Sequence, residues 1–102
     1  MTLIHRGLDF EQIMVPMPGE DDAELILVKV DGAVRAYRNR CPHLGVGLDY
    51  GDGRCLFDGM LECAMHAARF RPHDGFCVDG PCRGQGLIPV AVEVIGDDIR
   101  LS

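Results

Sequence analysis

The chain has 102 residues, of which 47% are hydrophobic and 25% charged, and its formal net charge is −6. This size and composition are typical of one globular domain, so we expect residues 1–102 to form a single domain. The longest uninterrupted apolar stretch, Leu87 to Val92, is far shorter than the roughly 20 residues that span a membrane. The acidic balance disfavours nucleic acid and anionic membrane surfaces as partners, since both attract clustered basic residues.

The predicted elements are short strands separated by turns. Residues 17–22 predict a loop, and the β-forming segments Glu24–Val30 and Ala33–Arg38 flank Asp31 and Gly32, a typical hairpin turn. Frequent glycines divide the rest of the chain into further strand-like segments: Arg54–Phe57, Met60–Glu62, Ala68–Phe70, Phe76–Val78, Ile88–Val94 and Ile99–Leu101. No window carries a convincing helical period of apolar residues. The pattern predicts an all-β fold of about eight to ten strands, as a sandwich or barrel.

The five cysteines are Cys41, Cys55, Cys63, Cys77 and Cys82. Their odd number, and an N-terminus without an apolar signal segment, argue against a disulfide scaffold and predict a cytoplasmic location. We interpret Cys55, Cys77 and Cys82 as buried free thiols, although Cys77 and Cys82 flank a turn and could approach each other.

Two short motifs carry the chemistry: Cys41 and His43 form a Cys-x-His pair, and Cys63 and His66 form a Cys-x-x-His pair. Zinc fingers usually take two cysteines from one loop and two histidines from the other. Here each loop supplies one of each, which suits a two-iron site. Cys41 and Cys63 would hold one iron and His43 and His66 the other, with a structural zinc site as the alternative.

The segment CPHLG, beginning at Cys41, and the segment CAMHA, beginning at Cys63, resemble the two cluster-binding loops of Rieske-type [2Fe–2S] proteins. The turn at Asp74 and Gly75 and the segment at Gly80 fit the same family. The resemblance implies an antiparallel β-sandwich with the two loops at one tip. It also implies one [2Fe–2S] cluster bound by the two cysteines and two histidines named above.

The sequence departs from the high-potential members of this family, which carry an extra cysteine in each loop and join the two by a disulfide. The corresponding residues here are Val46 or its neighbour Gly45, and Met65. Those relatives also place hydroxyl side chains after the second loop, where this chain has Ala68 and Phe70. Fewer hydrogen bonds to the cluster sulfurs imply a reduction potential near the low end of the Rieske range, about −150 mV.

Three further residues follow the second loop. Arg69 and Arg71 flank Phe70, and strand alternation predicts that both lie on one face. We expect that face to be solvated, with contact to a partner as the alternative. His73 is expected to be an exposed residue of a turn.

The resemblance implies a soluble one-electron carrier, a monomer or weak oligomer, that is not itself an enzyme. Its redox partners would be a ferredoxin reductase and a terminal oxygenase, such as that of an aromatic-ring dioxygenase system. An oxygenase would need a second domain with a mononuclear iron, and only His5 and His73 are spare as histidine ligands. The alternatives are a small subunit of an assimilatory nitrite reductase, a zinc-stabilised interaction module and, less favoured, a redox sensor.

Overall fold

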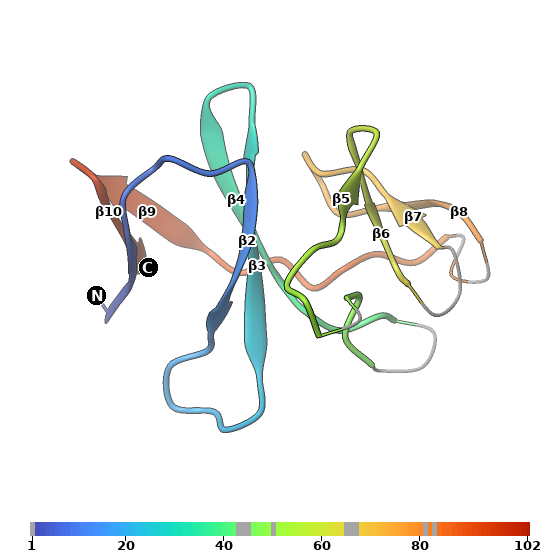
Figure 1. Ribbon diagram of the computed structural model, residues 1–102, viewed down its shortest axis with the longest axis horizontal. Coiled ribbons are helices and arrows are strands. Elements are labelled where there is room, and N and C mark those ends of the chain that lie inside the picture. Colours follow the sequence, from blue (N-terminus) through green and yellow to red (C-terminus); the bar gives the residue numbers. More distant parts are fainter. Residues whose placement is uncertain (1, 43–45, 50, 65–67, 81, 83) are drawn as a thin grey trace.

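A computed structural model describes residues 2–42, 46–49, 51–64, 68–80, 82 and 84–102. These residues form three antiparallel sheets with the orders β1-β10-β9, β2-β3-β4 and β5-β6-β7-β8 (Figure 1). The strands are β1 (Thr2–Arg6), β2 (Gln12–Pro16), β3 (Glu24–Val30), β4 (Ala33–Arg38), β5 (Leu56–Phe57), β6 (Met60–Glu62), β7 (Arg69–Phe70), β8 (Cys77–Asp79), β9 (Val92–Ile95) and β10 (Asp98–Leu101). The predicted all-β fold is confirmed.

No helix among the described residues is both long and apolar enough to cross a membrane.

The β3–β4 hairpin forms the middle of the molecule. Asp31 and Gly32 connect the strands with φ angles of 52° and 82°, the left-handed conformation that a tight hairpin turn requires. Alternate side chains of β3 point to opposite faces of the sheet. Both faces of β3 are covered by other parts of the protein, so the buried residues Leu25 to Val28 are all apolar. The strand therefore lies between two hydrophobic cores.

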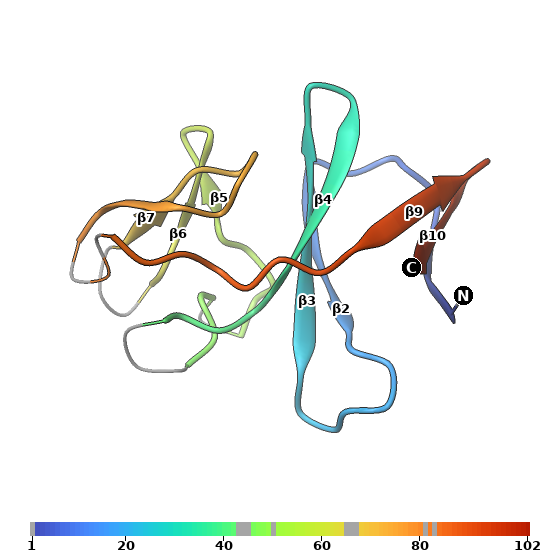
Figure 2. The ribbon, with the colours of Figure 1, turned by 180° about the vertical axis from the view of Figure 1, so that it is seen from behind.

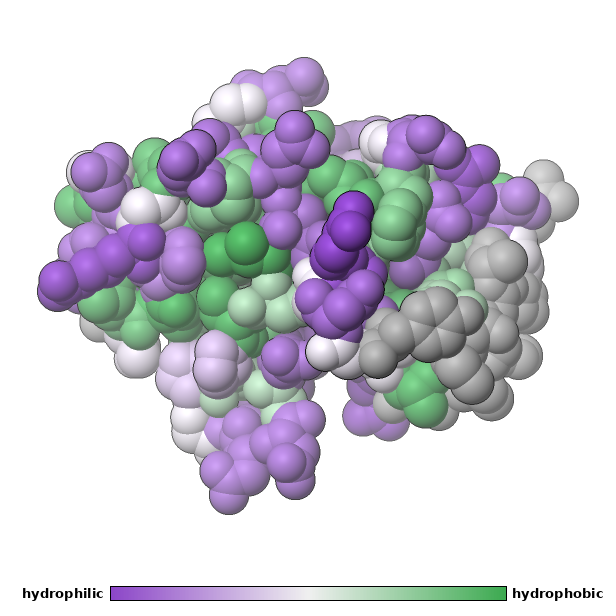
Figure 3. All heavy atoms as spheres, viewed as in Figure 1, coloured by the Kyte–Doolittle hydropathy of each residue, from purple (hydrophilic) through white to green (hydrophobic). Residues whose placement is uncertain are grey.

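One core, here called the loop core, lies toward the β5–β8 sheet. Its buried members are Ile26, Val28, Tyr37, Cys41, Leu48, Cys55, Leu61, Cys63, Ala68, Phe70, Cys77, Cys82 and Leu87. The other, here called the terminal core, lies between the β2–β4 sheet and the chain ends and contains Val15, Leu25, Leu27, Ala36 and Ile99. Figure 3 shows hydrophobic side chains gathered between the chain-end strands and β2, surrounded by mostly hydrophilic ones.

Two strands were not predicted from the sequence. β1 pairs with β10, with Thr2 opposite Leu101, and β2 pairs with β3, with Gln12 opposite Val28. Neither strand is marked by an adjacent turn of the Asp-Gly type. The pairing of β1 with β10 joins the two ends of the chain. A strand partner this far away in the sequence cannot be predicted from the residues around β1.

The predicted strand Ile88–Val94 is only partly correct, because regular pairing with β10 begins at Val92. The preceding residues lie along β4 instead: the Arg38 amide donates to the Ile88 carbonyl and the Val90 amide donates to the Ala36 carbonyl. Pro89 lies opposite Tyr37 in this short antiparallel bridge, at the non-hydrogen-bonded position, where its missing amide hydrogen costs no bond. Figure 2 shows the segment crossing β4 on its way from β8 to β9, which ties the two ends of the molecule together.

The interpretation of Cys77 and Cys82 as free thiols is wrong, because the two form a disulfide across the turn that follows β8. Their Cα atoms are 6.0 Å apart, a separation at which the bond forms without moving the backbone. Counting cysteines could not identify the pair, since the chain retains three others.

Candidate metal centre

The first predicted loop begins just after β4 and is closed at its base by the backbone. The Cys41 amide donates to the Val46 carbonyl at 2.6 Å, so the chain turns back on itself between these residues. The Cys41 side chain is fully buried in the loop core. His43 lies outside the described residues, so its predicted role stays a prediction.

Asn39 fixes the position of the first loop relative to the turns that follow it. Its side-chain oxygen accepts a hydrogen bond from the Leu48 amide at 2.7 Å, and its Nδ2 donates to Asp49 Oδ1 at 3.0 Å. Asp49 also accepts from the amides of Gly51 and Gly53. Partial burial alone would raise the pKa of Asp49, but these donors outweigh it and hold the pKa below its usual range.

Asn39 and Asp49 were missed in the sequence analysis. The spacing of Asp49 from Gly51 and Gly53 is the signal that could have indicated an aspartate-stabilised turn.

The second predicted loop connects β6 and β7. The Cys63 amide donates to the Ala68 carbonyl at 2.9 Å, directly beside the pairs Leu61 with Phe70 and Glu62 with Arg69. Cys63 is buried, as is Ala68. The loop is therefore the end of a β-hairpin, with its cysteine at the base.

The two loops are joined to each other. The Ala64 amide, next to Cys63, donates to the Leu48 carbonyl at 2.7 Å, and both cysteines belong to the loop core. His66, like His43, lies outside the described residues. Within the part of the chain that the structure describes, no three His, Cys, Asp or Glu side chains form a metal site. The structure thus connects the two predicted cysteine positions and leaves the histidine positions as predictions.

The residues after the second loop match the expectation that hydroxyl donors are missing there. Ala68 and Phe70 are fully buried and carry no side-chain donor. This arrangement supports the low-potential interpretation, which stays a prediction.

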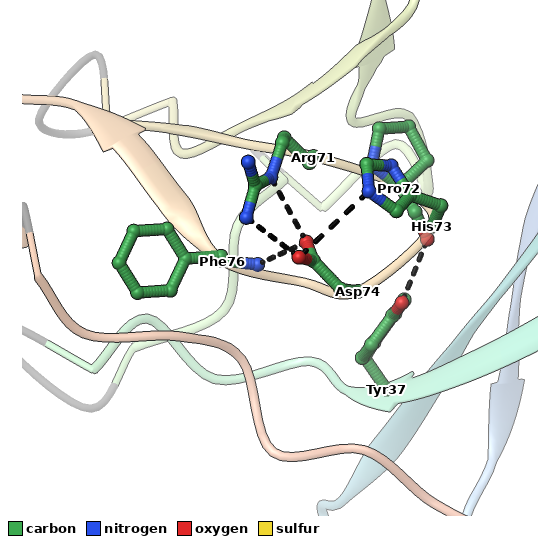
Figure 4. Close-up of polar contacts among 6 residues, drawn as sticks. All are labelled: Tyr37, Arg71, Pro72, His73, Asp74 and Phe76. Atoms are coloured by element: carbon green, nitrogen blue, oxygen red, sulfur yellow. Dashed lines mark hydrogen bonds and ion pairs between the residues drawn. The ribbon is translucent and has the colours of Figure 1, made fainter.

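The turn between β7 and β8 is fixed by a network of polar contacts (Figure 4). The Tyr37 hydroxyl donates to the Pro72 carbonyl at 2.7 Å. Asp74 accepts hydrogen bonds from the Phe76 amide and from two nitrogens of Arg71, and these contacts lower the pKa of Asp74. The His73 side chain is 58% exposed, which confirms the prediction of an exposed turn histidine.

Charged and polar groups beside the second loop differ in exposure. Arg69 Nε lies 3.6 Å from Glu62 Oε2 across the β6–β7 pair, and both side chains are partly exposed. Cys55 is fully buried, and its backbone carbonyl accepts from the Glu62 amide. Burial, together with the charges of Asp49 and Asp52, raises the pKa of the Cys55 thiol to about 12. Cys55 is therefore an unreactive core residue at neutral pH.

The comparison with protein families agrees with this arrangement of loops. Residues 13–97 match the family described as the Rieske [2Fe-2S] domain, so the chain belongs to the Rieske [2Fe–2S] domain family. The cofactor of that family is a [2Fe–2S] cluster.

Among curated proteins, the chain is similar to the ferredoxin component of the alkene monooxygenase system of Xanthobacter autotrophicus, with 38% identity over 68% of this chain and 48% of that protein. It is also similar to the chloroplastic protein TIC 55 of Arabidopsis thaliana, with 39% identity over 59% of this chain and 11% of that protein. The chain thus spans less than half the length of either of these relatives.

Among solved structures, the chain is similar to the ferredoxin of carbazole 1,9a-dioxygenase from Nocardioides aromaticivorans IC177. The TM-score is 0.71, the identity is 22%, and the alignment covers 99% of this chain and 95% of that one. At this identity the similarity establishes the fold, and the Rieske-type β-sandwich predicted from the sequence is confirmed.

The cysteines that the structure describes fit such a cluster. Thiolates are the ligands that iron–sulfur clusters require, and Cys41 and Cys63 present two buried sulfurs from two loops that are hydrogen-bonded together. The residues beside them are small, with Ala64 following Cys63 and Ala68 closing the loop.

Proposed function

We propose that this chain is a one-electron carrier, a single domain over residues 1–102, and not itself an enzyme. Cys41 and Cys63 would bind one iron of the [2Fe–2S] cluster, and His43 and His66 the other. When bound, the cluster accepts and releases one electron. The observation that carries the proposal is the hydrogen bond from the Ala64 amide to the Leu48 carbonyl, which joins two loops that each begin with a buried cysteine.

The protein's own residues have positioning roles in this proposal. The closed loop bases hold the two cysteines in the loop core, where water is excluded from their sulfurs. The hydrogen bonds of Asn39 to Leu48 and Asp49 limit movement of the first loop. A rigid site favours fast electron transfer, because little has to reorganise when the charge changes.

We propose a ferredoxin reductase as the electron donor and a terminal oxygenase as the acceptor, in the cytoplasm. The relative from X. autotrophicus is named as a ferredoxin component of a monooxygenase system, which supports a similar place for this chain. A net charge of −6 favours weak docking to basic surfaces on such partners, as a monomer or weak oligomer. The family match favours this carrier over the zinc module, and the similarity to a ferredoxin component favours it over the nitrite reductase subunit.

The decisive test is electron paramagnetic resonance of the purified protein after chemical reduction. We expect a Rieske-type signal and a midpoint potential of about −150 mV. Cys63→Ala should lose the cluster, whereas the matched core variant Cys55→Ala should keep it. His43→Ala and His66→Ala should lose the Rieske-type signal. A colourless protein that holds zinc, or a normal cluster in Cys63→Ala, would contradict the proposal.

A further inference from the structure

The Cys77–Cys82 disulfide lies within a short segment, residues 77–85, here called the clasp, of which residues 77–80, 82, 84 and 85 are described. Besides the covalent bond, two backbone hydrogen bonds hold its ends: the Cys77 amide donates to the Gln85 carbonyl at 2.8 Å, and the Gln85 amide donates to the Cys82 carbonyl at 2.9 Å. Val78, Asp79 and Gly80 lie between the two bonded cysteines.

Gly80, which lies between the two cysteines, packs against Ala68 at the base of the second loop. A Cβ atom on Gly80 would be 2.7 Å from the Cα of Ala68, closer than real Cβ atoms come, and 3.2 Å from the Ala68 nitrogen, a tight contact. Ala68 in turn accepts the hydrogen bond from the Cys63 amide. One continuous path of contacts thus joins the disulfide, through Gly80 and Ala68, to a proposed cluster ligand.

The cytoplasm, where we propose that this chain acts, is a reducing compartment. Disulfides that occur there are usually transient and respond to the redox state. Both sulfurs of the clasp are buried, with Cys77 0% and Cys82 1% exposed, so a reductant reaches them only when the clasp opens locally. Without the covalent bond, the described residues hold the clasp through backbone hydrogen bonds, the pairing of Cys77 and Asp79 with β7, the Gly80 contact and the packing of both cysteine side chains in the loop core. All of these contacts are non-covalent, so the clasp should open more often once the disulfide is reduced.

We propose that the Cys77–Cys82 disulfide is a dithiol-reducible clasp that controls the access of solvent and chelators to the cluster. One thiolate of a small dithiol attacks a disulfide sulfur, which breaks the Cys77–Cys82 bond and forms a mixed disulfide. The second thiolate of the reductant displaces the protein sulfur. Cys77 and Cys82 become thiols, the reductant becomes a disulfide, and two electrons and two protons pass to the protein. This inference rests on the proposed function, since it requires a cluster at the second loop.

The test measures how fast the visible absorption of the oxidised holoprotein bleaches when a ferric-iron chelator is added under anaerobic conditions. The double variant Cys77→Ser/Cys82→Ser should bleach on the order of tenfold faster than the oxidised wild type, because the link that limits opening is gone. Dithiothreitol should accelerate bleaching of the wild type to the same rate. It should leave the double variant unchanged, which excludes direct attack of the reductant on the cluster.

A second pair of variants keeps the disulfide and tests the contact itself. Gly80→Ala should bleach several-fold faster, because its methyl group forces the clasp away from Ala68. Gly84→Ala in the same segment is the matched control: Gly84 has a similar φ of +89°, but an added Cβ meets nothing within 4 Å. This pair remains informative if the double variant fails to fold.

Three results would overturn the inference. They are alkylation of Cys77 and Cys82 in the unreduced protein, a bleaching rate of the double variant within twofold of the wild type, and equal rates for Gly80→Ala and Gly84→Ala. A wild type that purifies without any cluster absorption would instead refute the proposed function.

Discussion

Glu62 and Arg69 place opposite charges on neighbouring strands at the base of the second loop. They are cross-strand partners, and Glu62 directly precedes Cys63 while Arg69 directly follows Ala68. Because both side chains are partly exposed, the ion pair contributes little to stability. If the cluster is bound at Cys63 as proposed, their charges should act on its reduction instead, since reduction adds one negative charge nearby.

Substitutions of this pair should shift the midpoint potential in opposite directions. Glu62→Gln removes a negative charge and should raise it, and Arg69→Gln removes a positive charge and should lower it, each by on the order of 10–40 mV in a partly solvated position. A potentiometric titration of each variant measures the shift. Identical shifts for the two variants would show that structural disturbance, not charge, changes the potential.

Asp49 should contribute stability that depends on pH. Its folded-state pKa lies below the unfolded value of about 3.9, so the stabilisation is complete above roughly pH 4 and is lost as the pH falls through the folded pKa. Asp49→Asn should therefore lower the free energy of unfolding by about 1 kcal/mol at pH 7, after allowance for solvent screening, and by less near pH 3. Urea unfolding across this pH range measures the difference.

The control for that measurement is Asp21→Asn in the exposed loop before β3. No hydrogen bond to the Asp21 side chain occurs among the described residues, so its substitution should change stability little at either pH. A pH dependence shared by both variants would contradict the role assigned to Asp49.

At the scale of elements, the turn between β7 and β8 is fixed by the close packing of Gly75 against Tyr37. A Cβ on Gly75 would lie 2.7 Å from Tyr37 Cε1, and the hydrogen bond from the Tyr37 hydroxyl to Pro72 prevents the ring from moving away. The turn also needs a φ of +74° at Gly75. Both backbone and packing therefore require glycine here.

Gly75→Ala should lower the free energy of unfolding by about 2–4 kcal/mol, through the sum of left-handed strain and the clash with the ring. Gly19 has a φ of +80° and open space around an added Cβ. Gly19→Ala should therefore lower the free energy of unfolding by only about 1 kcal/mol, because it introduces backbone strain without a clash. Thermal or urea unfolding compares the two. Equal losses would mean that the contact with Tyr37 is not a real constraint.

The elements that could be predicted from the sequence are those that local chemistry specifies. The bounds of β3, β4 and β6 are correct as predicted, because the Asp-Gly turn and the glycine spacing act on neighbouring residues. β1 and β2 were missed because their stability comes from partners such as Leu101 and Val28 that lie far along the chain or carry no turn signal.

The candidate site was predictable to the same extent. Cysteine and histidine spacing identified the two loops, and the structure connects Cys41 and Cys63 through hydrogen-bonded loop bases. The disulfide and the contact of Asn39 with Leu48 and Asp49 were not predictable, because they depend on which side chains the fold brings together. The turn at Asp49 did have a local signal, its spacing from Gly51 and Gly53. His43 and His66 stay predictions that the spectroscopic test addresses.

At the scale of the whole molecule, the two cores lie on opposite faces of the β3–β4 hairpin, and each takes residues from both strands. The loop core contains both predicted cysteine ligands, whereas the terminal core contains residues of β2, β3, β4 and β10 and none of these ligands. Metal binding contributes folding free energy to the part of a protein that supplies the ligands. Loss of the cluster should therefore affect the two cores unequally.

Removal of the cluster with a chelator should reduce the protection of backbone amides against hydrogen exchange in β6, β7 and residues 46–49, while β10 and its pairing with β1 stay protected. Hydrogen–deuterium exchange of the holo and apo proteins measures this. A uniform loss of protection would show that the molecule unfolds as one cooperative unit.

The pairing of β1 with β10 also has a practical consequence. Thr2 and Leu101 are partners, and both chain ends lie at one extreme of the longest dimension of 37 Å, with the β5–β8 sheet at the other (Figures 1 and 2). A protein anchored to an electrode through either end would point its loop core outward into solution. The two ends are thus equivalent handles for orienting the molecule on a surface, and a fusion at one of them leaves the opposite extreme uncovered.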